Sequence, residues 1–508
     1  MKNVQRISTL FLLGAMVFLL AACNPPAGSD SDTAGAFPSG LSVASPTAYQ
    51  ASAGGIASRA VGGYASEYEV EVAEIDALLS ATSTSSCGFE PAEFLSSAVN
   101  AACYGPSIAY QNHPDGADAA GSPPTLPGGD VGMWLEADAT SGNACAADQL
   151  DSRLTGISRR ASASLKGLAS MVCVALASGE TLPAAGGSLD LLTQMNALGV
   201  TDTSFTTATL THSTDSSGDD VYAYSLAFNY TPGSSDYDIG VAMSHTPNGS
   251  TSGLFKGRMT YHVNNDAGTD SNGYCAGAGI SDNASLVYDR TASALNLEMR
   301  SGRYCGEEDG LNASNVMDPT PYDAATATGG WAENFNKLTA SFDPDDLAGD
   351  YVYAWQAGKG DSHSRVFNAH VSNDSSTGIP TVEAFFGFGN AMDSFSGNIE
   401  GMICNWAGPG NSHTPIDAVQ HQVASLNTTT GVFDASTSAL AYAPANNCIQ
   451  GGGSFTFDIN GDGTLDGGDD VTGLASSHSL LTLNDIDVNG EWDEIEAVVS
   501  LPSTPTYP

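Results

Sequence analysis

The feature that most constrains the fold is a series of short segments between residues 203 and 450 in which large apolar side chains alternate with small or polar ones. The alternation is clearest at 222–230, 295–299 and 351–355, and turn-rich stretches separate the segments. Successive side chains of a β-strand point to opposite faces, so a period of two predicts strands with one apolar and one polar face. Many short strands of this kind predict a large antiparallel β barrel or sandwich over residues 201–450.

A different period precedes these strands. Residues 59–200 carry apolar side chains at spacings of three and four, which predicts helices. One helix is expected at Glu67–Leu79, and a longer one follows it. The apolar stripe of the longer helix is Leu150, Leu154, Ile157, Ala161, Leu165, Leu168, Val172 and Ala175. The predicted fold class is therefore α+β, mainly β, with a helical region before the β domain.

The first residues have the pattern of an export signal. Lys2 and Arg6 are followed by an apolar run from Leu10 to Ala22, which is too short to span a bilayer but typical of a secretory signal. The run ends Leu-Ala-Ala-Cys23, which resembles the lipobox of bacterial lipoprotein precursors. The resemblance implies a signal peptide at 1–22, cleavage before Cys23, and acylation of this residue as a membrane anchor. An ordinary signal with an incidental cysteine is the alternative.

The residues after the anchor are low in large apolar side chains. Residues 23–58 are mostly Gly, Ser, Ala, Pro and Thr, a composition that predicts a flexible tether. Asn24 after the lipobox cysteine favours the outer membrane, with the body either periplasmic or exposed at the cell surface.

The chain is strongly acidic, and this charge excludes some partners. It has 57 acidic and 15 basic residues, and loss of Lys2 and Arg6 with the signal leaves 13 basic residues, a net charge of 13 − 57 = −44. Nucleic acids and anionic membrane surfaces require cationic protein surfaces, so neither is expected as an electrostatic partner. The acidity is expected to maintain solubility or to gather divalent cations. A protein or glycan partner stays open.

The remaining cysteines predict disulfides. Nine cysteines minus Cys23 leave eight, an even number in an oxidising compartment. They are Cys87, Cys103, Cys145, Cys173, Cys275, Cys305, Cys404 and Cys448. If the longer helix is continuous, Cys145 and Cys173 lie about 40 Å apart and cannot bond to each other. Each would then pair with Cys87 or Cys103, whereas a helix break at Gly156 or Gly167 would allow them to pair together.

The same helix holds a concentration of positive charge. Arg153, Arg159, Arg160 and Lys166 lie within 14 positions of one another in a chain that has few basic residues. They are expected either to face solvent or to dock against the acidic remainder of the chain.

A C-terminal segment, 451–508, carries the clearest ligand-binding motif. Its first loop resembles the calcium loop of EF-hand and dockerin modules, with Gly463 at the sharp turn. The resemblance implies that calcium is bound by Asp458, Asn460, Asp462, Thr464, Asp466 and Asp469. The alternative is a solvated turn between strands. Neither flank of the loop has a clear amphipathic helix, so a structural calcium clamp is expected instead of a sensor.

A second, weaker match begins 27 residues later. Its ligands would be Asp485, Asp487, Asn489, Glu491, Asp493 and Glu496. A hairpin around Asn489-Gly490 is the competing interpretation, because this dipeptide favours a type I′ turn.

No familiar catalytic motif is present: the sequence has no HExxH, GxSxG, SxxK or Walker loop. The leading hypothesis is a non-catalytic cell-envelope lipoprotein with a structural or adhesive role and a calcium-stabilised C-terminus. One alternative is a ligand-binding β barrel whose aromatic side chains line a lumen for an apolar compound or a glycan. The other is a secreted hydrolase whose active site is assembled from distant residues.

Overall fold

The protein is mainly β. A computed structural model describes residues 35–52, 61–95, 104–105, 133–134, 137–138, 141–247, 253–265, 280–305, 335–356, 363–391, 402–403, 415–416, 420–436, 448–451 and 454–457. A 13-stranded antiparallel sheet dominates these residues, and its strands follow one another in chain order from β5 to β15, then β18 and β19. The strands are β5 (Gly187–Asp190), β6 (Thr203–Thr214), β7 (Asp220–Tyr230), β8 (Tyr237–Pro247), β9 (Phe255–Asn265), β10 (Ile280–Arg290), β11 (Leu295–Cys305), β12 (Phe335–Phe342), β13 (Gly349–Gln356), β14 (His363–Asn373), β15 (Pro380–Ala391), β18 (Gln420–Leu426) and β19 (Phe433–Ala435).

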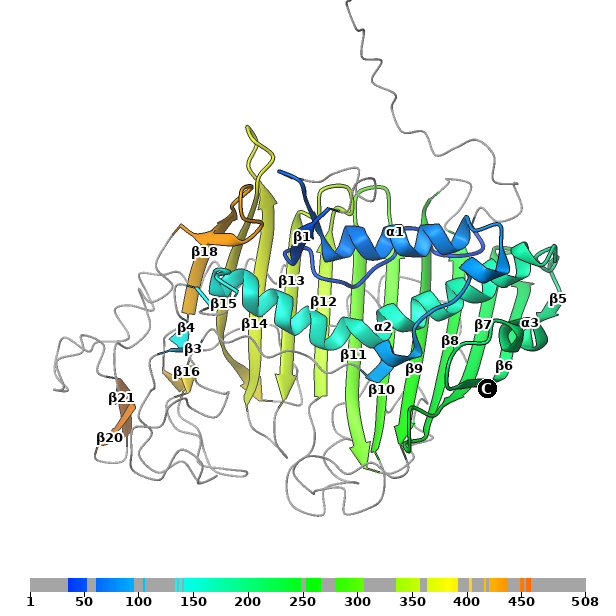
Figure 1. The fold of residues 1–508 in the computed structure, drawn as a ribbon. Helices are drawn as coiled ribbons and strands as arrows, with labels where there is room; N and C mark the ends of the chain where they lie inside the picture. Colours follow the sequence, from blue (N-terminus) through cyan, green and yellow to red (C-terminus); the bar gives the residue numbers. More distant parts are fainter. Residues whose placement is uncertain are drawn as a thin grey trace, which may run out of the picture.

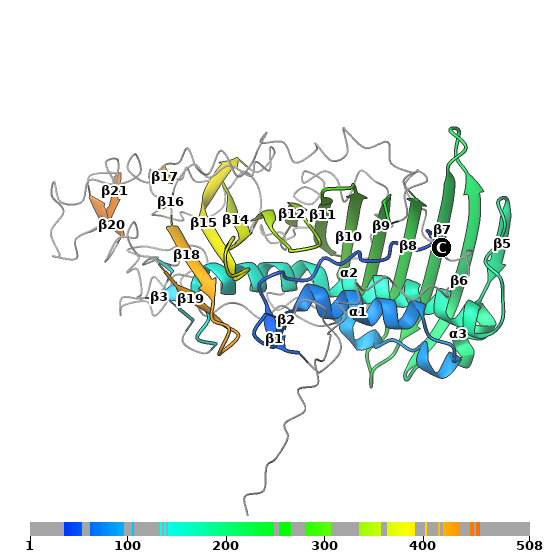
Figure 2. The same ribbon diagram turned by 90° about the horizontal axis from the view of Figure 1, so that it is seen from above.

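The sheet is not closed. Its outermost strands, β5 and β19, do not pair with each other, so the expected barrel is not formed. The large sheet also does not pack on a second large sheet among the described residues, as a sandwich would. Instead, helices cover one of its faces (Figures 1 and 2). The prediction of a helical region followed by many antiparallel strands is confirmed, and the prediction of a barrel or sandwich is corrected to an open sheet covered by helices.

The remaining elements are short, apart from two helices. The helices are α1 (Glu67–Leu79), α2 (Cys145–Ala177), α3 (Leu192–Ala197) and the 3₁₀ turns η1 (Thr84–Ser86) and η2 (Pro91–Leu95). Four two-stranded sheets pair β1 (Tyr49–Ala51) with β2 (Tyr64–Ser66), β3 (Tyr104–Gly105) with β4 (Met133–Trp134), β16 (Met402–Ile403) with β17 (Pro415–Ile416), and β20 (Cys448–Gly451) with β21 (Ser454–Phe457).

Helix α2 lies across the strands and forms the centre of the core. It contacts β18 and β15 near one side of the sheet and β7 near the other. Every residue from Gly167 to Ala175 is buried, so this part of the helix is covered on all sides. By length and composition α2 could cross a membrane, but 78% of its most apolar window is buried inside the protein, as expected of a core helix. The helix is continuous through Gly156 and Gly167.

The first turn of α2 is held by the far edge of the sheet. The Ala146 amide donates to the side-chain oxygen of Gln422 on β18 at 2.7 Å, and the Ala144 amide donates to the Phe433 carbonyl on β19 at 2.8 Å. The first amides of a helix have no partner within the helix, so these contacts satisfy groups that burial would otherwise leave unpaired.

Helix α1 has the predicted bounds and lies beside α2 (Figure 1). It begins with a capping box, in which the Ser66 hydroxyl accepts from the Glu69 amide and the Glu69 carboxylate accepts from the Ser66 amide. Tyr68 and Ile75, two residues of its predicted apolar stripe, are buried, and the Tyr68 ring packs edge-on against Phe342 of β12.

Residues 35–52, which the sequence assigns to the flexible tether, are part of the folded body instead, and most residues from 36 to 47 are buried. Phe37, Leu41 and Val43 are at most 5% exposed. The Tyr224 hydroxyl donates to the Ala36 carbonyl at 2.5 Å, and His245 Nε2 lies 3.0 Å from the Gly35 carbonyl. We call residues 35–48 the strap. Its few apolar side chains are enough to fix it, because β7 and β8 supply hydrogen-bond donors for its backbone.

The strap contact also defines the state of His245. Burial lowers the pKa of this ring to about 3, so it is neutral at physiological pH. A neutral ring has one donor and one acceptor, and the Gly35 carbonyl can only accept. Nε2 therefore carries the proton, and Nδ1 accepts from the Tyr288 hydroxyl at 3.3 Å.

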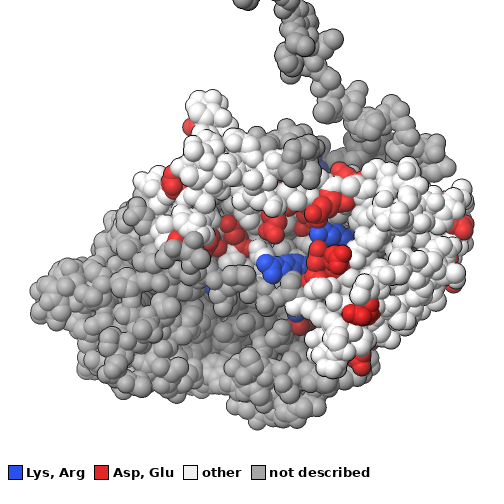
Figure 3. All heavy atoms as spheres, viewed as in Figure 1, with Lys and Arg blue, Asp and Glu red and all other residues white. Residues whose placement is uncertain are grey.

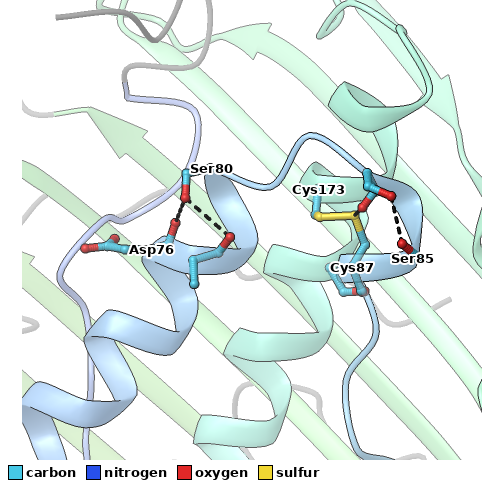
Figure 4. Close-up of a disulfide and its surroundings, with 8 residues drawn as sticks. Asp76, Ser80, Ser85, Cys87 and Cys173 are labelled. Carbon is cyan, nitrogen blue, oxygen red and sulfur yellow. Dashed lines mark hydrogen bonds between the residues drawn. A yellow bond between two sulfur atoms is a disulfide. The ribbon is translucent and has the colours of Figure 1, made fainter. Parts of the chain in front are cut away.

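A disulfide ties the end of α2 to the segment after α1 (Figure 4). Cys87 and Cys173 are bonded, with Cα atoms 5.5 Å apart. This bond confirms the predicted pairing of Cys173 with one of the two early cysteines. Cys145 is also disulfide-bonded. Cys103, Cys275 and Cys404 lie outside the described residues, and only the backbones of Cys305, at the end of β11, and Cys448, at the start of β20, are described.

The sheet face away from the helices carries polar side chains interspersed with apolar ones such as Val352 and Phe385. Across neighbouring strands, Ser244, Arg258, Val287, Glu298 and Thr339 stand in one row. Glu298 is 1% exposed and forms an ion pair with Arg300 of the same strand at 2.8 Å. A carboxylate this deeply buried needs such a partner.

Two short turns at one end of the sheet are each capped by a side chain of their own first residue. The Asp374 carboxylate accepts from the amides of Ser376 and Thr377, and Gly378 adopts φ +68°. Asn427 caps its own turn in the same way, with Gly431 at φ +76°. Asp and Asn favour this local bond, and Gly adopts a positive φ at little cost, so each turn is set by its own sequence.

The close packing of α2 against β7 can be tested by substituting two glycines of α2, one at the contact and one exposed as a control. A Cβ at Gly167 would lie 3.1 Å from Leu226 of β7, whereas Gly156 on the same helix is exposed. We expect Gly167→Leu to lower the free energy of unfolding by about 1–3 kcal/mol through overpacking. Gly156→Leu should raise it by about 0.5–1 kcal/mol, because Leu is the better helix former. Denaturant unfolding measures both, and equal effects would contradict the close approach at Gly167.

Candidate functional site

The polar sides of α1 and α2 face each other and leave a hollow between them. On α1, carboxylates recur at spacings of four and three, which places them on one face of the helix. On α2, small or polar residues recur at a spacing of four. These residues are Glu67, Glu71 and Glu74 on α1, and Ser158, Ser162 and Lys166 on α2.

The hollow is a cavity of about 320 Å³. Its wall is completed by the strap, by β1 and by η2. The described lining residues are Ala44, Gln50, Glu67, Val70, Glu71, Glu74, Glu93, Ser158, Arg159, Ser162 and Lys166. Figure 3 shows acidic and basic side chains gathered in a hollowed part of the face that carries the helices. A volume of this size is within the range of small-molecule sites.

Lys166 holds the rim of the cavity together. Its Nζ lies 2.7 Å from Glu74 on α1 and 3.3 Å from Glu93 on η2. Burial lowers the pKa of Lys166, but the hydrogen bond to Glu74 and the charges of Glu93 and Glu74 outweigh it and raise the pKa. Lys166 is therefore cationic. The side chains of Glu74 and Glu93 are 51% and 39% exposed, so the rim is open to solvent.

A second basic residue of α2 also docks on the protein. Arg160 forms an ion pair with Asp282 of β10 at 3.0 Å, and its Nε donates to the Phe94 carbonyl of η2 at 2.8 Å. Of the two expectations for the basic residues of this helix, docking against acidic groups therefore describes Arg160 and Lys166.

Glu71 is the buried carboxylate of the site. It is 5% exposed, and its Oε2 accepts from the Ser162 hydroxyl at 2.5 Å. Its Oε1 is buried and has no hydrogen-bond partner. The Ser42 hydroxyl of the strap lies near the carboxylate but outside hydrogen-bond geometry to Oε1. A buried polar atom without a partner is uncommon in a native protein and calls for an explanation, such as a bound ligand.

Burial controls the protonation of Glu71. Loss of solvent raises its pKa to about 7, the bond from Ser162 and the charge of Lys166 oppose this rise, and the charge of Glu67 adds to it. Burial also raises the pKa of Glu67, and Arg159 and Lys166 oppose this shift. Perturbed carboxylates in a cavity are typical of functional sites, although structural ion pairs also shift pKa values.

The lining residues of this cavity include none of the residues predicted as sites from the sequence. Cys23 and both calcium loops, 458–469 and 485–496, lie outside the described residues. Within the part of the chain that the structure describes, no group of three or more His, Cys, Asp or Glu side chains could hold a metal ion. Calcium at the C-terminus stays a prediction.

The cavity residues were not predicted from the sequence, although their spacing is a signal for them. The helix at Glu67–Leu79 was predicted from its apolar side chains, and its carboxylates were not part of that prediction. A glutamate stripe on one helix and a serine stripe on another are visible in the sequence. That the two stripes face each other is a fact of tertiary packing.

Comparison with known proteins adds no further information, because no protein-family model, curated protein or solved structure matches this chain.

The protonation of Glu71 can be tested by measuring stability at different pH values. Because its folded pKa of about 7 lies above the ordinary value of 4.5, the folded protein binds more protons than the unfolded chain between these values. The contribution of Glu71 to the free energy of unfolding is therefore favourable below about pH 4.5 and is lost as the pH rises to 7. At pH 8 we expect Glu71→Gln to unfold at a higher temperature than wild type, with a free energy of unfolding larger by up to about 3 kcal/mol. At pH 5 the two proteins should unfold at similar temperatures.

The control for this test is Glu180→Gln, which changes an exposed glutamate just beyond α2. It should follow wild type across the pH range. If wild type and Glu71→Gln lose stability equally between pH 5 and pH 8, Glu71 does not titrate in this window.

Proposed function

We propose that this protein is an exported, lipid-anchored and non-catalytic binding protein of the cell envelope that takes a small polar ligand between α1 and α2. The observation that carries the proposal is the buried Glu71 carboxylate, which lines a cavity and has an oxygen without a hydrogen-bond partner. Its export and anchoring rest on the signal and on the lipobox cysteine, Cys23.

The packing of the sheet favours a polar ligand over an apolar one. Tyr224, Phe228 and Tyr351, from the alternating aromatic positions that suggested an apolar lumen, belong to the same buried cluster as the apolar residues of α2. The side chains that would line a lumen are therefore core residues. The described cavity instead has four carboxylates, two basic groups and two hydroxyls among its lining residues.

The absence of familiar catalytic motifs from the sequence supports a binding role. The carboxylates of the rim, Glu74 and Glu93, are engaged by Lys166. The other polar groups of the lining are two further carboxylates, the Arg159 guanidinium, two hydroxyls and an amide. Such groups can hold and orient a ligand by charge and hydrogen bonds.

The binding role is tested by closing the cavity. We expect native mass spectra of the full chain, purified from membranes in mild detergent, to show a bound small molecule. Ser162→Leu should abolish this signal, because the larger side chain occupies the space beside Glu71. Gly156→Leu, an exposed change on the same helix, should keep it. A wild-type protein without a bound molecule, and without a thermal shift in a mixture of polar metabolites, would contradict the binding role.

The anchor and the calcium loops are tested together. Cys23→Ser should release the protein from the membrane fraction, because no acyl chain can be attached. The released protein should unfold at a higher temperature in excess calcium than in chelator, since metal that binds only the folded state stabilises it. Asp458→Ala/Asp462→Ala should remove this difference. Retention of the Cys23→Ser protein in membranes would contradict the anchor, and equal unfolding with calcium and chelator would contradict the clamp.

A further inference from the structure

The charges that line the cavity are unbalanced. Four carboxylates face two basic groups, so the ionised lining has a net charge of 2 − 4 = −2. At the rim, Lys166 bridges Glu74 and Glu93. Deeper in the cavity lie Glu67 and Glu71, with Glu71 the more buried. The cavity therefore favours a ligand that brings positive charge.

Several classes of cation do not suit the lining. Metal ions would need three or more converging ligands, and the described residues contain no such group. Quaternary ammonium groups are bound by aromatic cages, and none of the described lining residues is aromatic. A primary ammonium group has three N–H donors, which suit carboxylate and hydroxyl oxygens.

The spacing of the carboxylates points to two ammonium groups. Glu67 and Glu71 are four residues apart on α1, so their Cβ atoms are about 5–6 Å apart. The nitrogens of a four-carbon diamine, joined by five single bonds in a zigzag, are about 6 Å apart. Val70 and Ala44 add apolar surface that can contact the methylene groups of such a chain.

We propose that the ligand of this cavity is a short aliphatic diamine or polyamine, held by Glu67 and Glu71 at successive ammonium groups. The inference rests on the proposed binding function and names its ligand class. The carboxylate of Glu71, which lines the cavity, accepts from one ammonium group, and that of Glu67 accepts from the other. The hydroxyl of Ser158 lines the same cavity and offers a further acceptor.

The experiment is a calorimetric titration of the full chain, purified in mild detergent at pH 8, with 1,4-diaminobutane. We expect saturable binding of one molecule per chain. 1-Aminobutane should bind about tenfold or more weakly, because it forms one charged contact instead of two. The neutral 1,4-butanediol and the anionic succinate, which have similar length, should not bind.

Variants separate the cavity from the general acidity of the protein. Glu71→Gln and Glu67→Gln should each weaken binding of the diamine by about tenfold or more, since each removes one charged partner. Glu180→Gln, an exposed change outside the cavity, should bind like wild type. Diamine binding that is equal in all three variants would overturn the proposal, because it would show that the amine gathers on the acidic surface.

The outcomes also separate the ligand class from the binding function. Binding of butanediol or succinate that is lost in Ser162→Leu, with no binding of the diamine, would overturn the ligand class and leave the binding function standing. Equal affinity for 1-aminobutane and 1,4-diaminobutane would overturn the two-charge geometry. If none of the probes binds and native mass spectra show no bound molecule, both proposals are overturned.

Discussion

The fold depends on the burial of one long helix against the open sheet. An antiparallel sheet has an apolar face that must be covered, and here α2 covers it by lying across the strands. Its 33 residues span about 50 Å, and the ten strands from β18 to β7 span about 43 Å at 4.8 Å for each of nine spacings. The helix is therefore long enough to cross these ten strands. The disulfide at Cys173 and the hydrogen bonds at Ala144 and Ala146 secure its two ends.

The candidate site follows from this arrangement. Helix α1 and η2 pack beside α2, and Tyr68 of α1 and the start of the strap also contact the sheet. The polar stripe of α2 at Ser158 and Ser162 has small side chains, and the carboxylates of α1 stand opposite them, so the two helices enclose a cavity. The same arrangement buries Glu71 and raises its pKa. A buried carboxylate lowers stability in its charged form, and this is the kind of local cost that proteins carry at functional sites.

The strap connects the site to the proposed anchor. Ala44 of the strap lines the cavity, and Gly35 at its start is held by His245. If Cys23 is acylated as proposed, 35 − 23 = 12 positions separate the anchor from Gly35, whereas the composition alone suggested a tether of about 35 residues. Packing of the strap therefore shortens the part of the chain that could act as a tether.

The sequence by itself determined the local structure. The period of two specified the strands, the spacing of apolar residues specified α1 and α2, and the turns capped by Asp374 and Asn427 follow from local hydrogen bonds and a glycine. These features depend on residues close together in the chain. The tertiary structure alone decided that the sheet stays open, since closure depends on whether β5 and β19 meet, and alternation is the same in a barrel and in an open sheet. It also decided that the strap is buried and that Glu71 faces Ser162, because both contacts join segments whose sequences carry no information about each other.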